Sequence, residues 1–154
     1  MLERLFSLFT DSAGKRGVHE EDDPKVAAAA LLFHVMDADG ERREEERTRL
    51  TQSLAATYGL SEAELHRVMK AGEAADREAV DLYAFTSVIK RELDETGRLD
   101  FIRLMWEVVF ADGVMHELED NTVWRVAELI GISNRDRILL RQEVASARGV
   151  DIKG

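Results

Sequence analysis

The residues best suited to chemistry are acidic and recur in two matching places. Two Asp-Gly dipeptides are each followed by one glutamate five residues after the aspartate and another seven residues after it. The six acids are Asp39, Glu44, Glu46, Asp112, Glu117 and Glu119. Carboxylate oxygens are the ligands that hard cations such as Ca²⁺ and Mg²⁺ prefer. The pattern predicts a divalent-cation site, with Glu44 and Glu117 as its reserve ligands.

A second interpretation of the same acids needs no metal. Asp-Gly is a common turn dipeptide, and a glutamate near a helix start can bond back to that start and favours the helix dipole. Arginines at 42, 43, 47 and 49 would neutralise the first acidic run. An EF-hand is excluded, because counting from Asp37 places Arg42 and Thr48 where that loop needs glycine and glutamate. The metal and capping interpretations both stay open.

Other chemistry finds little support. The chain has no cysteine, which excludes disulfides, thiolate nucleophiles and cysteine-ligated zinc. No phosphate loop, dinucleotide fingerprint or nucleophile elbow occurs. His116 stands between Met115 and Glu117 at an expected helix start, where a ligand role is the less favoured interpretation. We expect a protein that is not an enzyme.

The elements that must position the acids are helices. Apolar residues recur at helical spacing, and no run has the alternation of a strand. The start signals are Asp23-Pro24 and the capping box from Ser61 to Glu64. We expect helices over 24–36 and 44–58, one that opens at Ser61 and one after Asp81. Gly97 is expected to separate this last helix from the next one, over 99–110. Two more are expected around 123–130 and after Ser133, and the apolar residues of the final helix include Ile138, Leu139 and Val144.

An internal repeat organises these helices. Residues 33–61, FHVMDADGERREEERTRLTQSLAATYGLS, align with residues 106–133, WEVVFADGVMHELEDNTVWRVAELIGIS. Each copy reads as an apolar helix, an Asp-Gly turn, a charged helix and a Gly-apolar-Ser exit. Repeated hairpins with apolar faces pack together to share a core. We expect an all-α fold: a compact bundle of six to eight helices with two pseudo-symmetric helical hairpins.

These features resemble the TerB-like (tellurite-resistance protein B) family. The resemblance rests on both Asp-Gly turns, their downstream glutamates, the Gly-Leu-Ser exit and the long apolar helix before the second turn, and it covers about residues 24–148. It implies a compact helical fold, a bacterial stress or metal-resistance context, and acidic clusters suspected of binding divalent metal. Residues 41–43 and 114–116 depart from the family's pattern after Asp-Gly.

The N-terminal residues form a separate region. Residues 1–9, MLERLFSLF, are apolar but interrupted by charge, and residues 10–23 have the glycines and charges of a flexible linker. We therefore divide the chain into a short apolar helix plus acidic linker over 1–23 and a helical domain over 24–150. Neither a secretory signal nor a membrane span is expected, so the expected compartment is the cytoplasm.

Two functions remain open. The first is a non-enzymatic, stress-associated module that binds an unidentified protein partner and a divalent cation. The alternative is a membrane-peripheral adaptor that residues 1–9 anchor at the inner membrane. The net charge of −10 argues against nucleic-acid binding, and the sequence leaves a homodimer open.

Overall fold

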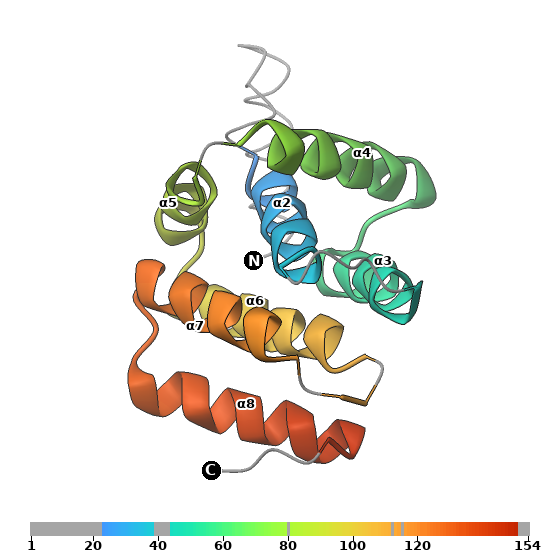
Figure 1. Cartoon of the computed structure of the whole chain (residues 1–154). Helices are drawn as coiled ribbons and strands as arrows, with labels where there is room; N and C mark the ends of the chain where they lie inside the picture. The colour runs from blue at the N-terminus through green and yellow to red at the C-terminus, as the bar shows by residue number, and fades with distance from the viewer. Residues whose placement is uncertain (1–22, 39–43, 80, 112, 115, 151–154) are drawn as a thin grey trace.

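A computed structural model describes residues 23–38, 44–79, 81–111, 113–114 and 116–150. Within these ranges the chain is all-helical, as predicted (Figure 1). The helices are α2 (Pro24–Met36), α3 (Glu44–Tyr58), α4 (Glu62–Glu78), α5 (Tyr83–Glu92), α6 (Glu95–Val109), α7 (Glu117–Leu129) and α8 (Asn134–Arg148). These seven described helices agree with the expected bundle of six to eight. The proposed N-terminal helix lies outside the described residues.

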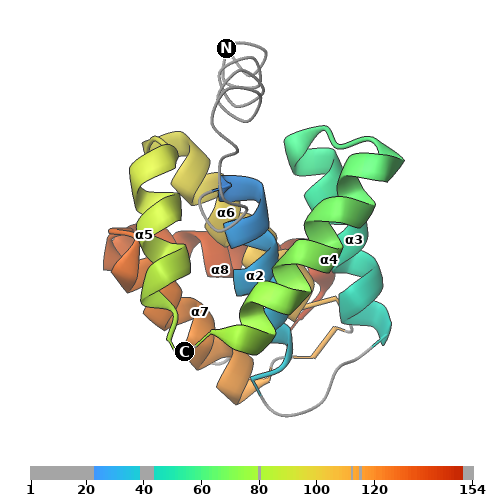
Figure 2. The ribbon, with the colours of Figure 1, turned by 90° about the horizontal axis from the view of Figure 1, so that it is seen from above.

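Helix α2 is the central element of the first half. It begins because the Asp23 side chain accepts a hydrogen bond from the Lys25 backbone N–H at 2.9 Å, while Pro24 needs no such partner. Every side chain over residues 27–33 is fully buried. Helices α3, α4, α5, α6 and α7 all pack against α2 (Figures 1 and 2). An alanine-rich helix suits this position because its short side chains let neighbouring helices approach from every side.

Helix α6 is the corresponding element of the second half. The Asp94 side chain accepts a hydrogen bond from the Gly97 backbone N–H at 2.8 Å, so the helix starts at Glu95. Gly97 therefore lies within the first turn, and the expectation that it separates two helices is wrong. Helices α3, α7 and α8 pack on α6. Its buried Trp106 stacks on Phe110 with ring centroids 5.4 Å apart.

The two hairpins, α2–α3 and α6–α7, share a buried aromatic at the equivalent position. Phe33 in α2 and Trp106 in α6 are both fully buried. A guanidinium lies over each ring, from Arg47 of α3 at 5.6 Å and from Arg141 of α8 at 5.8 Å. The repeat thus keeps the cation–π contact but draws the cation from different elements.

The outer face of α8 departs from the expected apolar pattern. Val144 is buried, whereas Ile138 and Leu139 are 40% and 51% exposed. Helix α8 packs on α6 and α7, and these contacts cover only one side of the helix. The apolar residues on the other side remain at the surface.

Helices α2 and α4 approach each other closely at Gly72. Gly72 of α4 faces Ala29 of α2, and a Cβ at position 72 would lie 2.5 Å from the Ala29 Cβ. It would also lie 3.1 Å from backbone atoms of Ala29 and Ala30. Because backbone cannot move aside as a flexible side chain does, this position requires glycine.

We expect Gly72→Ala to lower the free energy of unfolding by about 1–3 kcal/mol through overpacking, despite the roughly 1 kcal/mol that alanine gains in helix propensity. Denaturant unfolding measures the change. Combining it with Ala29→Gly completes a double-mutant cycle. A favourable coupling energy between the two substitutions is expected, and independent, additive effects would contradict the close contact.

Tyr58 ends α3 with its hydroxyl inside the protein. The hydroxyl oxygen is buried and has no hydrogen-bond partner among the described residues. Burial, and secondarily the negative charge of Asp100, raise the pKa of Tyr58 well above the ordinary value of 10.0. The folded protein therefore retains the phenol proton at pH values where the unfolded chain releases it.

Titration of Tyr58 should therefore leave the free energy of unfolding unchanged below about pH 10. Above that pH the free energy of unfolding should fall, because the unfolded chain releases the phenol proton and the folded protein retains it. In a Tyr83→Phe background, Tyr58 is the remaining tyrosine and its phenolate absorbance reports on it alone. We expect that absorbance to rise together with the loss of helical circular dichroism. A phenolate signal near pH 10 from fully helical protein would contradict the buried environment.

Candidate metal centre

Three side chains with metal-ligand chemistry converge where the two hairpins meet. Glu46 comes from the first turn of α3, Glu119 from the first turn of α7, and His116 from the residue before α7. One ligand atom from each lies within 4.8 Å of the others. Glu46 lies 70 positions before His116 and 73 positions before Glu119 in the sequence. We call these three residues the Glu46–His116–Glu119 cluster.

The local structure explains how the two glutamates come to point at each other. Glu46 and Glu119 are each the third residue of a helix, one in each copy of the repeat. The partial positive charge of a helix N-terminus favours a carboxylate there. His116 has an extended backbone and makes no side-chain capping bond to α7. Its ring is therefore not used to cap the helix.

Burial separates this arrangement from ordinary helix capping. Glu46 and Glu119 are both 0% exposed, and His116 is half-buried. Two carboxylates held together away from water need compensation, from hydrogen bonds, from a proton or from a cation. A cap alone requires neither burial nor a second carboxylate. The geometry suits a bound divalent cation, and the donor set of one imidazole and two carboxylates is one that such ions use.

The residue that follows each buried glutamate forms an ion pair with a different neighbouring helix. Arg47 lies 3.9 Å from Glu73 of α4. At the equivalent position Asp120 binds Arg141 of α8 at 2.7 Å, with both side chains largely buried. Opposite charges thus occupy matching positions of the repeat. The Asp120–Arg141 pair ties the first turn of α7 to α8, whereas the longer and more exposed Arg47–Glu73 pair contributes little to the position of α3.

The other predicted ligands are distributed differently. Asp39 and Asp112 lie outside the described residues, so their part in the site stays a prediction. Glu44 and Glu117 are exposed and do not belong to the cluster found among the described residues. Both start the same helices as Glu46 and Glu119, but two residues along a helix is more than half a turn. Their side chains therefore face away from the buried carboxylates.

His116, which the sequence did not favour as a ligand, lies in the cluster. It precedes Glu119 by three positions, a spacing that brings side chains together at a helix start. The equivalent of His116 in the first copy of the repeat is Arg43. The repeat therefore did not indicate a ligand at position 116. The neighbouring glutamates were the available signal.

Comparison with known proteins identifies the family. A family model described as "Tellurite resistance protein TerB" matches residues 25–142, which is most of the chain and includes the whole cluster. No curated protein and no solved structure matches. Each helix in the described part of the chain is too short or too polar to span a membrane.

The Asp120–Arg141 pair provides a test of how the α7 start is held. We expect Asp120→Ala to lower the free energy of unfolding by about 2 kcal/mol, because it leaves a largely buried guanidinium without this carboxylate. Glu143→Ala is the matched control, since its 3.0 Å pair with Arg103 is exposed. That variant should cost about 0.5 kcal/mol or less. Equal losses in the two variants would contradict an anchoring role for Asp120.

Proposed function

This chain belongs to the tellurite resistance protein TerB family, and we propose that it is a non-enzymatic helical module that binds one divalent cation and a protein partner. The cation is held by the Glu46–His116–Glu119 cluster. The observation that carries this proposal is the convergence of these three ligand-type side chains, two of them fully buried, from both copies of the repeat.

A cation at this position joins the two halves of the protein. Glu46 belongs to the first hairpin, whereas His116 and Glu119 belong to the second. Helices α3 and α7 share few direct contacts. Binding energy at the cluster therefore adds to the stability of the folded state. The expected role of the ion is structural.

The donor types favour a first-row transition ion. The sequence suggested Ca²⁺ or Mg²⁺, which prefer oxygen ligands throughout. The imidazole of His116 adds a nitrogen donor, and the combination of histidine and carboxylates suits Zn²⁺ and its neighbours in the series better. We therefore expect Zn²⁺ to bind more tightly than Mg²⁺ or Ca²⁺.

Burial of the carboxylates favours a structural role for the ion. Three protein ligands would leave a fourth position of a tetrahedral ion for water, as in catalytic zinc sites, but a substrate would have to reach that position past buried side chains. Both carboxylates here are shielded from solvent. The net charge of −10 also opposes direct binding of a tellurium oxyanion. We propose that the link to tellurite resistance runs through a partner protein.

Thermal unfolding of metal-stripped protein, with and without Zn²⁺, Mn²⁺, Ca²⁺ or Mg²⁺, tests the cation site. An ion at about 100 times its dissociation constant should stabilise the fold by roughly 2.7 kcal/mol. We expect Glu46→Gln and Glu119→Gln to abolish the Zn²⁺ response. Glu44→Gln and Glu117→Gln remove the same charge from the same helix turns and should preserve it.

The substitution His116→Gln tests whether the imidazole nitrogen contributes to Zn²⁺ binding. It should remove most of the Zn²⁺ response, while His66→Gln, a histidine on the exposed side of α4, should leave that response intact. Loss of the response in both histidine variants would point to adventitious surface binding. No shift with any of the four cations would reject the metal site and leave the acids as helix-start residues.

The alternative of a membrane-peripheral adaptor stays a prediction. Its anchor, residues 1–9, lies outside the described residues, and no observation on the described helices favours it. The cytoplasm remains the expected compartment.

A further inference from the structure

The surface around the buried cluster exposes apolar side chains. Val114 and Leu118, which flank His116 in sequence, are 52% and 54% exposed. Most other large apolar residues of the described chain are in the core. Large exposed apolar side chains that lie near one another commonly mark a contact surface for another molecule.

Exposed carboxylates lie at the same end of the molecule. Glu44 and Glu45 immediately precede Glu46, and Glu117 lies between His116 and Leu118; all three glutamates are exposed. Because the ligand atoms of Glu46 and Glu119 lie within 4.8 Å of each other, the starts of α3 and α7 are neighbours. Val114, Leu118 and the three exposed glutamates together form what we call the helix-start surface.

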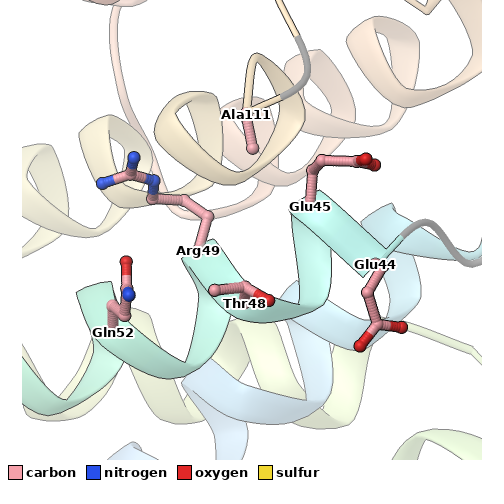
Figure 3. A pocket seen from close by; sticks show the side chains of 6 residues that line it. All are labelled: Glu44, Glu45, Thr48, Arg49, Gln52 and Ala111. Atoms are coloured by element: carbon pink, nitrogen blue, oxygen red, sulfur yellow. The ribbon is translucent and has the colours of Figure 1, made fainter.

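A shallow hollow extends this surface along α3. It has a volume of about 330 Å³ and lies between α3 and the end of α6. Figure 3 shows Ala111 across the hollow from Glu45 and Arg49. The lining residues are Glu44, Glu45, Thr48, Arg49, Gln52 and Ala111. This volume is at the lower end of the range for ligand pockets, so it admits one or two side chains of a larger partner.

We propose that the helix-start surface docks a basic, apolar segment of a partner protein, in which leucine-like side chains alternate with lysine or arginine. Such a segment is complementary to this surface in both charge and polarity. Apolar side chains of the partner would cover Val114 and Leu118, and its cations would meet Glu44, Glu45 and Glu117. Arg49 adds one cation to the lining of the hollow. The three exposed glutamates outnumber it, and together with the net charge of −10 they would repel an acidic segment. This inference rests on the partner half of the proposed function and does not require the cation.

The test uses a defined probe and the full chain. A fluorescein-labelled helical peptide of lysine and leucine, and a second in which glutamate replaces lysine, are titrated with protein at physiological salt. Fluorescence anisotropy is recorded on metal-stripped and on Zn²⁺-loaded protein. We expect the lysine–leucine peptide to bind in at least one of these states and the glutamate–leucine peptide to bind in neither.

Matched variants distinguish this surface from general attraction to an acidic protein. Leu118→Ser should weaken peptide binding about fivefold or more, whereas Leu139→Ser, on the similarly exposed Leu139 of α8, should leave it unchanged. Glu45→Gln should likewise weaken binding, and Glu128→Gln, which removes one exposed charge near the end of α7, should not. Circular dichroism confirms that each variant is folded.

The outcomes separate the two proposals. Equal weakening by Leu118→Ser and Leu139→Ser, or by Glu45→Gln and Glu128→Gln, would overturn the docking site and indicate attraction by net charge. Absence of binding in both metal states would also overturn it. Loss of the Zn²⁺ response in Glu46→Gln with peptide binding retained would support both proposals. A missing Zn²⁺ response in the unmodified chain would reject the cation site alone.

Discussion

The main constraint on the junction between the two hairpins is that it buries two carboxylates close to each other. Glu46 and Glu119 lie where the two hairpins meet, both shielded from water. Two negative charges in such a place are unfavourable unless positive charge lies close by. The N-termini of α3 and α7 supply part of it, and the imidazole beside them marks where a cation can supply the rest.

The surrounding helices pack on the two hairpins and hold them in this arrangement. α2 and α6 are equivalent in the repeat, and each is buried along most of its length because other helices cover it. The close approach of α4 at Gly72 fixes α2, and the pairing of Asp120 with Arg141 fixes the start of α7. The duplication is not exact. Arg47 and Asp120 occupy matching positions with opposite charge, so each hairpin is joined to its own third helix.

Inside and outside of this end of the molecule have different properties. The interior holds the ligand-type side chains, whereas the exterior carries exposed glutamates and the apolar side chains of Val114 and Leu118. A cation that stabilises the junction from within would hold the outer surface in one shape. This gives a physical connection between the two parts of the proposed function.

The sequence alone determined the helices, their main boundaries and the repeat. Apolar spacing, the Asp23-Pro24 start and the Ser61 capping box depend on neighbours within one turn, and the structure bears them out. The tertiary structure decided which side of each helix is covered. It paired Glu46 with Glu119, added His116, and left Glu44, Glu117 and Leu139 at the surface. The reason is that helical spacing relates side chains on one helix only. Whether a face meets water, an apolar partner or another carboxylate depends on helices that are distant in the chain.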